Sequence, residues 1–172
     1  MNFKDYIKDI PDFPKKGIVF KDISPLLMNP DALDEITNII ADRYSENMPD
    51  KIVGLDARGF IFGSIVAGKL GVPFVMTRKE GKLPDKTISQ KYELEYGFNV
   101  FEMHTNSIQP NDKVLIIDDL LATGGSMEAV TILVEKLHGQ ICGIECIIEL
   151  GFLEGRKKLN NYKVNSQIIY ND

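Results

Sequence analysis

Long apolar runs are missing from this sequence, and their absence limits where the protein can reside. A transmembrane helix needs about 20 consecutive apolar residues, whereas charges or glycines interrupt every apolar stretch here well before that length. Near the start, Lys4, Asp5, Lys8 and Asp9 alternate with apolar residues, unlike the basic and then apolar order of a signal peptide. We therefore expect no membrane partner and a cytoplasmic location.

Cysteine is scarce, since Cys142 and Cys146 are the only two in the chain. If their segment is a strand that rises about 3.3 Å per residue, the two lie roughly 13 Å apart, too far for a disulfide. We expect both to be buried free thiols, which suits a reducing compartment.

An excess of basic residues is also lacking, because the net charge is -5 and the isoelectric point is near 5.1. This balance argues against a nucleic-acid partner but leaves room for a local anion pocket. No stretch is dominated by Gly, Pro or Ser, and 44% of the residues are apolar. We expect residues 1–172 to fold as one domain around a hydrophobic core.

Helices and short apolar strands alternate along the chain. Asn29 offers a capping side chain before Pro30, and apolar residues at helical spacing follow to about Tyr44. Further helices are expected to end at Gly71 and to span 126–137, and strands are expected at 51–55, 73–77, 113–117, 141–150 and within 160–172. This alternation predicts an α/β fold with a mainly parallel twisted sheet flanked by helices, and a ligand site at the carboxyl ends of the strands.

Residues 78–97 interrupt this alternation. They show little periodicity and are rich in charged side chains. A connection of about 20 residues without secondary structure is long for a compact domain, and such loops tend to be functional lids or disordered spacers. The residues alone leave both a lid and a spacer open.

Residues 114–126 give the strongest signal for function. The apolar run Val114–Ile117 is followed by Asp118 and Asp119, and then by a small-residue loop that opens a helix. Adjacent carboxylates at a strand end can accept hydrogen bonds from a pair of sugar hydroxyls. The loop consists of Ala122, Thr123, Gly124, Gly125 and Ser126. Its N-H groups and hydroxyls can surround a phosphate, which the dipole of the following helix favours.

Other interpretations of this segment are a plain strand end with a helix cap, or a different phosphate-binding loop. Neither G-x-x-x-x-G-K-[ST] nor a G-x-G-x-x-G between a strand and a helix occurs. All positions of 114–126 instead resemble the phosphoribosyl pyrophosphate motif of the type I phosphoribosyltransferases. That resemblance implies the type I fold, with Asp118 and Asp119 at the ribose and the small-residue loop at the 5'-phosphate.

Within that family the chain resembles the adenine phosphoribosyltransferases over nearly its whole length. Residues 11–27 look like the family's adenine-reading segment, part of a small hood formed by residues 1–30. The resemblance implies that Val19, Phe20 and Lys21 bind adenine. The Val19 carbonyl would accept from the exocyclic amine, and the Lys21 N-H would donate to N7. Many members have Arg at the position of Lys21, a change that a main-chain contact tolerates.

The resemblance also implies residues for the leaving group and for the other face of the base. Arg58 follows a strand in the place of the family's pyrophosphate loop, where its planar fork can bind two phosphate oxygens. Residues 78–97 are similar to the family's lid and supply three further pyrophosphate ligands, Arg78, Lys79 and Lys82. Glu95 would be the general acid or base, with Arg58 also catalytic. Leu153 would pack on one face of adenine.

The implied reaction transfers the phosphoribosyl group of phosphoribosyl pyrophosphate to N9 of adenine, with Mg²⁺ bound mainly through the substrate and no direct protein ligand. Water could join the ion to Asp118 and Asp119. A homodimer is expected because members of the family are usually dimers. Two alternatives remain open: a phosphoribosyltransferase for hypoxanthine, guanine or xanthine, and a non-catalytic sensor of phosphoribosyl pyrophosphate. The sensors carry an added DNA-binding domain, for which we see neither spare length nor a basic face.

Overall fold

Seven strands form a twisted sheet in a computed structural model that describes residues 1–94 and 97–172. The strand order is β5-β6-β4-β3-β7-β8-β9. Their bounds are β3 Lys51–Leu55, β4 Phe74–Lys79, β5 Thr87–Glu93, β6 Phe98–His104, β7 Lys113–Leu121, β8 Gln140–Leu150 and β9 Val164–Tyr170. Five neighbouring strands run parallel, namely β4, β3, β7, β8 and β9. β6 pairs antiparallel with β4, and β5 pairs antiparallel with β6. The expected mainly parallel sheet is confirmed.

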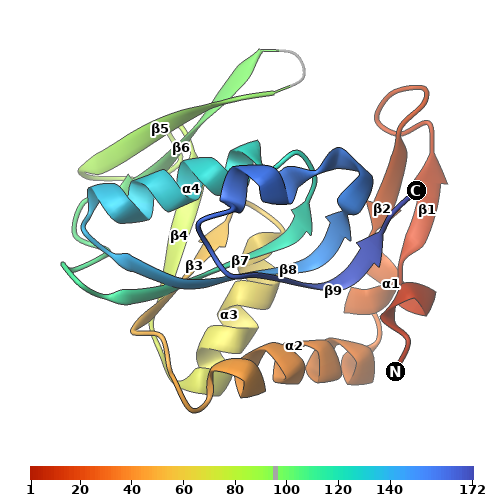
Figure 1. Ribbon diagram of the computed structural model, residues 1–172, viewed down its shortest axis with the longest axis horizontal. Helices are drawn as coiled ribbons and strands as arrows, with labels where there is room; N and C mark the ends of the chain where they lie inside the picture. Colours follow the sequence, from red (N-terminus) through yellow and green to blue (C-terminus); the bar gives the residue numbers. More distant parts are fainter. Residues whose placement is uncertain (95–96) are drawn as a thin grey trace.

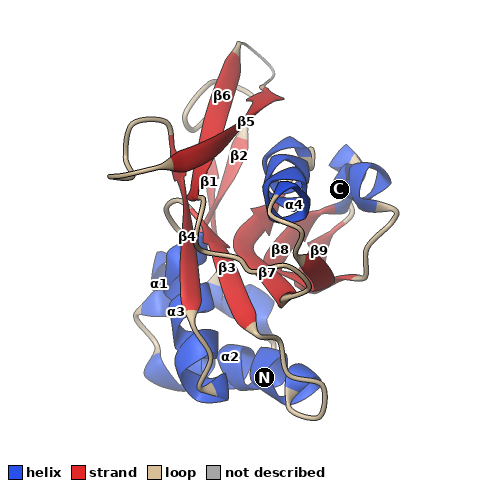
Figure 2. Cartoon of the chain, turned by 90° about the vertical axis from the view of Figure 1, so that its left-hand side faces the viewer, coloured by secondary structure: helices blue, strands red, loops and turns tan. Residues whose placement is uncertain are grey.

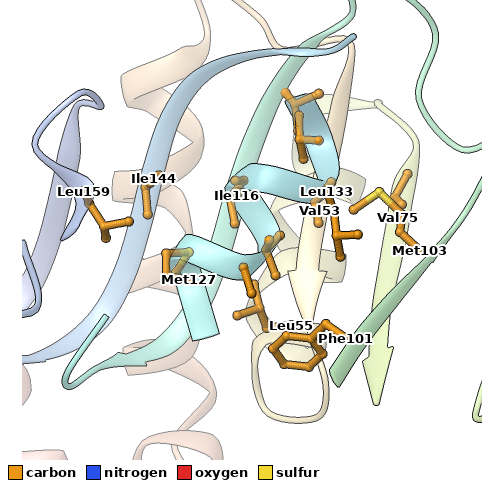
Figure 3. Packing of buried hydrophobic residues seen from close by; sticks show 14 of the residues in the cluster. Val53, Leu55, Val75, Phe101, Met103, Ile116, Met127, Leu133, Ile144 and Leu159 are labelled. Atoms are coloured by element: carbon orange, nitrogen blue, oxygen red, sulfur yellow. The ribbon is translucent and has the colours of Figure 1, made fainter. Parts of the chain in front are cut away.

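Helices cover both faces of this sheet (Figure 1). α2 (Pro30–Tyr44) and α3 (Gly59–Leu70) lie on one face, and α4 (Gly125–Lys136) lies on the other. Successive strand residues point to opposite faces, so Ile52 packs with α2 and α3 while Val53 packs with α4. Figure 3 shows the second cluster, in which Met127 and Leu133 of α4 cover buried strand residues.

The observed elements follow the sequence closely where the apolar pattern is strong. α2 begins at Pro30, and the Asn29 side chain accepts a hydrogen bond from the Ala32 N-H at 2.9 Å, as a capping residue should. A final strand, β9, is also present. β7 is longer than expected, because it continues to Leu121, so Asp118 and Asp119 lie within the strand and not after it.

The segment 78–97 differs from the irregular loop that its weak periodicity suggested. β4 continues to Lys79, and β5 pairs with β6 along its whole length. Figure 2 shows this hairpin rising away from the rest of the sheet. The Lys136 ammonium of α4 donates to the Ser89 carbonyl at 3.2 Å and to the Gln90 side chain at 2.9 Å. The hairpin therefore packs on α4.

The N-terminal residues form a second, two-stranded sheet that we did not predict. β1 (Lys8–Pro11) pairs with β2 (Val19–Asp22), between a 3-10 turn, η1 (Phe3–Tyr6), and the short helix α1 (Ser24–Leu27). Figure 1 shows this pair beside the carboxyl end of β9. From Ile23 onward the chain joins the main core, since Ile23 and Leu26 are buried against α2.

Two expectations about the whole chain meet different outcomes. Within the described residues, no helix combines the length and the apolar character needed to cross a membrane. Cys142 and Cys146 are free, and Cys146 is buried as expected, but Cys142 is only half-buried. Cys142 lies near the start of β8, in the part of the strand that is less covered than its centre.

Candidate active site

The switch point of the sheet lies between β3 and β7. β3 leads through α3 to β4 on one side, and β7, on the other side of β3, leads through α4 to β8. The connections leave in opposite directions, so a crevice opens at the carboxyl ends of the two strands. Two functional segments of the sequence meet here, namely residues 56–58 after β3 and residues 118–126 in β7 and its loop.

A pocket of about 280 Å³ occupies this crevice. It is lined by Leu55, Asp56, Ala57, Arg58, Lys79, Tyr92, Asn99, Phe101, Asp118, Asp119, Leu120, Ala122, Thr123, Gly124 and Ser126. The structure thus brings the two acids, the small-residue loop and two of the predicted pyrophosphate ligands to one cavity. Of the loop, only Gly125 is missing from this lining.

Arg58 and Asp119 are in contact across the pocket. The Arg58 Nε lies 2.8 Å from Oδ2 of Asp119, whose residue is only 5% exposed. Gly59, the next residue, packs closely on β7, because a Cβ there would lie 2.8 Å from Oδ1 of Asp118. Oδ2 of Asp119 is buried, and its only contact among the described residues is the ion pair with Arg58, so a second lone pair remains for a hydroxyl.

The two acids are difficult to ionise together. Burial, followed by repulsion from Asp119, raises the pKa of Asp118 well above its usual range. Burial also raises the pKa of Asp119, although the Arg58 guanidinium opposes that rise. Oδ1 of Asp118 accepts from the Asp119 N-H at 2.9 Å, which fixes the orientation of the first carboxyl group. The pair therefore favours contact with donors, such as sugar hydroxyls or a hydrated cation.

The small-residue loop is held against the segment that follows β8. Gly124 has φ +82°, and a Cβ there would lie 2.5 Å from the Gly155 carbonyl oxygen. A Cβ on Gly155 would in turn lie 2.3 Å from the carbonyl oxygen of Ala122. Both glycines are required by this close approach. As a result, the loop and the residues after β8 have a fixed relative position.

The predicted pyrophosphate ligands are only partly assembled. Lys79 lines the pocket beside Arg58, whereas Arg78 and Lys82 are not among its lining residues. The Arg78 Nε lies 3.3 Å from Oδ2 of Asp56, and Arg78 Nη1 donates to the Lys82 carbonyl at 3.3 Å. Lys82 itself is exposed on the turn between β4 and β5.

A second pocket, of about 800 Å³, adjoins the first. It is lined by Asp9, Gly17, Ile18, Val19, Lys21, Glu93, Leu94, Thr123, Leu150, Phe152, Leu153, Lys158 and Asp172. Three of the four residues predicted to bind adenine are therefore together. Thr123 lines both pockets, so a base in the larger one would lie next to a phosphoribosyl group in the smaller one.

The main chain of β2 suits a role in reading a base. Val19 and Lys21 are two residues apart, so their main-chain groups point to the same edge of the strand. Both Val19 and Lys21 line the larger pocket, so this edge of β2 lies beside the space available to a base.

The Lys21 side chain, unlike its main chain, makes contacts within the protein. Its Nζ donates to both carboxylate oxygens of Asp9, at 2.7 and 2.9 Å, and lies 3.9 Å from the centre of the Tyr170 ring. Lys21 thereby joins β2 to β9. Phe20 lies outside the larger pocket, and its ring is 5.0 Å from the Arg58 guanidinium carbon.

Several lining residues of the smaller pocket were not predicted from the sequence, and one predicted catalytic residue has no described position. Glu95 lies outside the described residues. Tyr92, Asn99 and Phe101 were not predicted, and they enter the smaller pocket from the hairpin, where the rings of Tyr92 and Phe101 stack at 4.9 Å. In β5 only Ile88 and Tyr92 are apolar, and their even spacing is a weak strand signal for this hairpin.

Magnesium fits this site as a partner of the substrate. Within residues 1–94 and 97–172, no group of three or more His, Cys, Asp or Glu side chains could hold a metal ion. Asp118 and Asp119 nevertheless place hard oxygen donors beside the pocket. One or two carboxylates together with substrate phosphates are the usual environment of Mg²⁺ in proteins.

Comparison with known proteins agrees with this geometry. Residues 22–171 match the phosphoribosyl transferase domain family. The adenine phosphoribosyltransferase of Natranaerobius thermophilus is 51% identical over 164 residues, which cover 95% of this chain and 96% of that protein.

Solved structures show the same fold at high similarity. The adenine phosphoribosyltransferase of Thermoanaerobacter pseudethanolicus has a TM-score of 0.94 and 46% identity, with 98% of each chain covered. The Saccharomyces cerevisiae enzyme, complexed with D-2,5-dideoxy-2,5-imino-altritol 1,6-bisphosphate and adenine, has a TM-score of 0.91 and 40% identity, with 96% of each chain covered.

Proposed function

The chain belongs to the phosphoribosyltransferase family and, within it, to the adenine phosphoribosyltransferases, and from this premise we propose how its own residues carry out the transfer. It moves the 5-phosphoribosyl group of phosphoribosyl pyrophosphate to N9 of adenine, which gives AMP and pyrophosphate in purine salvage. The observation that supports the assignment of residues is the pair of adjoining pockets that share Thr123.

Adenine occupies the larger pocket. The Val19 carbonyl accepts from the exocyclic amine, the Lys21 N-H donates to N7, and Leu153 packs on one face of the ring. The common edge that Val19 and Lys21 present, and the place of Val19, Lys21 and Leu153 in the lining of one pocket, support this arrangement. Phe20 supports the adenine site indirectly, because its ring contacts the Arg58 guanidinium group.

The phosphoribosyl group occupies the smaller pocket. Main-chain N-H groups and hydroxyls of residues 122–126 bind the 5'-phosphate at the start of α4, where the helix dipole favours an anion. Asp118 and Asp119 accept from the ribose hydroxyls. The buried Oδ2 of Asp119, which the described part of the chain engages only through the ion pair with Arg58, supports this role.

Pyrophosphate departs between β3 and the hairpin. Arg58 and Lys79 bind it within the pocket. Arg78, at the end of β4, and Lys82, on the turn after it, approach when the lid formed by residues 78–97 closes. Mg²⁺, when bound through the substrate oxygens, neutralises part of the charge on the leaving group. Arg58 stabilises the same charge in the transition state.

N9 of adenine attacks C1 of the ribose as the bond to pyrophosphate breaks, and positive charge develops on the sugar ring. Glu95 acts as general acid or base near the purine nitrogens. Closure of the lid excludes water, which would otherwise capture the cationic sugar. The two free thiols are in keeping with a cytoplasmic location, and we expect a homodimer.

A product balance tests the reaction. The purified protein is incubated with phosphoribosyl pyrophosphate, adenine and Mg²⁺, and AMP and pyrophosphate are measured separately. Equal amounts of both, abolished by a chelator and restored by Mg²⁺, are expected. Pyrophosphate released without AMP would mean hydrolysis and would contradict the transfer.

A further inference from the structure

We propose that Lys158 is an additional ligand of the 5'-phosphate, supplied by the segment after β8. The inference rests on the proposed function of the small-residue loop. Lys158 lies in the 3-10 helix η3 (Gly155–Leu159). Its Nζ is 3.6 Å from the position that a Cβ would take on Gly125, the first residue of α4.

The Lys158 side chain is exposed to solvent, and the helix end beside it favours an anion and not a cation. The N-terminus of a helix carries partial positive charge, so a cation there is repelled by the dipole. Among residues 1–94 and 97–172, no ion pair joins Lys158 to a carboxylate. A phosphate bound at the start of α4 would satisfy both the ammonium group and the helix.

The small-residue loop has no cation of its own. Residues 122–126 are neutral, while Asp118 and Asp119 lie directly before them in the same pocket. Arg58 and Lys79 line that pocket too, and we have placed them at the pyrophosphate. A doubly charged phosphate beside two acids gains from a nearby positive group. Lys158 is the lysine that reaches the loop from the larger pocket.

The backbone that carries Lys158 is held in place. Gly155 packs directly on Gly124, as its close approach shows. Arg156 forms a two-point contact with Glu149, at 2.6 and 2.7 Å, and donates to the Val164 carbonyl at 2.7 Å. These contacts fix η3 against β8 and β9, so Lys158 is presented to the loop by ordered neighbours.

Lys157 provides a matched control. It is the adjacent residue, its side chain is 72% exposed, and its Nζ lies 2.6 Å from Glu154 instead of facing the loop. Removing its charge alters the net charge of the protein by the same amount as removing that of Lys158. Any general electrostatic effect should therefore be equal in the two variants.

The test compares Lys158→Gln and Lys157→Gln by calorimetric binding of AMP and of ribose 5-phosphate, and by the KM for adenine. Lys158→Gln should weaken both phosphate-bearing ligands about 10-fold or more, because a charge-assisted hydrogen bond is lost. The KM for adenine should stay within about 2-fold. Lys157→Gln should resemble the unaltered protein throughout, and Lys158→Arg should restore most of the affinity.

Unchanged affinity for ribose 5-phosphate in Lys158→Gln would overturn the proposal, as would a loss confined to adenine, which would place the ammonium group at the base. Binding of ribose 5-phosphate needs no turnover. A protein that makes no AMP but loses ribose 5-phosphate affinity in Lys158→Gln would thus contradict the proposed reaction and still support the phosphate ligand.

Discussion

The Arg58 Nε lies 2.8 Å from Oδ2 of Asp119, and this contact joins the ends of two strands on either side of the switch point. Arg58 follows β3, and Asp119 lies in β7. In the proposed mechanism, the first binds the leaving pyrophosphate and the second binds the ribose. Their contact therefore places the two groups on either side of the bond that breaks.

Replacing Arg58 by Lys tests this relationship. Lys keeps the positive charge but loses the planar fork that binds phosphate and Asp119 together. We expect kcat/KM for phosphoribosyl pyrophosphate to fall about 10- to 100-fold, with little change in the affinity for adenine. Steady-state kinetics with each substrate varied in turn provide the measurement. An equal loss for both substrates would show that the pocket as a whole had been disturbed.

Glu149→Gln should change stability in a pH-dependent way. Burial acts to raise the pKa of Glu149, but hydrogen bonds from Arg156 and Ser166 outweigh it and hold the pKa below that of an ordinary glutamate. A lowered folded-state pKa stabilises the protein above the unfolded value, and this gain disappears as pH falls through the folded value. The variant should unfold at a lower temperature at neutral pH, and the gap should narrow below about pH 4.5.

Thermal unfolding across that pH range supplies the measurement. Lys157→Gln, whose partner Glu154 is exposed, is the control and should track the unaltered protein. If the difference in unfolding temperature between Glu149→Gln and the unaltered protein stays constant or grows in acid, an ionised Glu149 is not the source of the stability.

The Lys21 side chain should affect adenine binding through the position of β2. Its ammonium group pairs with Asp9 and lies over the Tyr170 ring, so it joins the hood to β9. Lys21→Met removes the charge and keeps the main chain, and we expect the KM for adenine to rise several-fold, on the order of 3- to 10-fold. The KM for phosphoribosyl pyrophosphate should be unchanged.

Lys21→Arg serves as the conservative comparison and should restore the KM for adenine, because a guanidinium can make the same contacts with Asp9 and Tyr170. If Lys21→Met leaves the KM unaltered, the hood is held in position by other contacts, such as that of the N-terminal amine with Glu35 at 3.1 Å.

Glu95→Leu should lower turnover by roughly 100-fold or more, since general acid or base catalysis contributes about that much. Substrate binding should change little. Glu93→Leu is a suitable control, because Glu93 lies in β5 at the edge of the larger pocket and has no assigned role in proton transfer. Near-normal turnover of Glu95→Leu in a steady-state assay would exclude the proposed role.

The sequence was most informative where one physical requirement dominates the pattern. The apolar run before Asp118 predicted a buried strand, and Asn29 with Pro30 predicted the start of α2. The small-residue loop was identified before the start of a helix, where the structure places it, and α4 begins at Gly125. These features depend on local residues, so they can be read without the rest of the fold.

The parts that escaped prediction depend on distant contacts. β5 is half-exposed and gains its order from pairing with β6 and from Lys136 of α4, so its own pattern is weak. β1 and β2 are short, and the residues between them are polar or exposed. Lys158 has no distinguishing local pattern, and its place at the loop arises from the packing of Gly155 and Arg156.

A competition among bases tests the central claim most directly. Adenine, hypoxanthine, guanine and xanthine are mixed in equal amounts with phosphoribosyl pyrophosphate, Mg²⁺ and the purified protein, and every nucleotide formed is quantified by chromatography. We predict AMP alone, because the Val19 carbonyl requires a donor at the exocyclic position, which adenine has and an oxo group lacks. Nucleotides of the oxopurines in place of AMP would contradict the assignment of Val19 and Lys21, and no nucleotide at all would contradict the transfer itself.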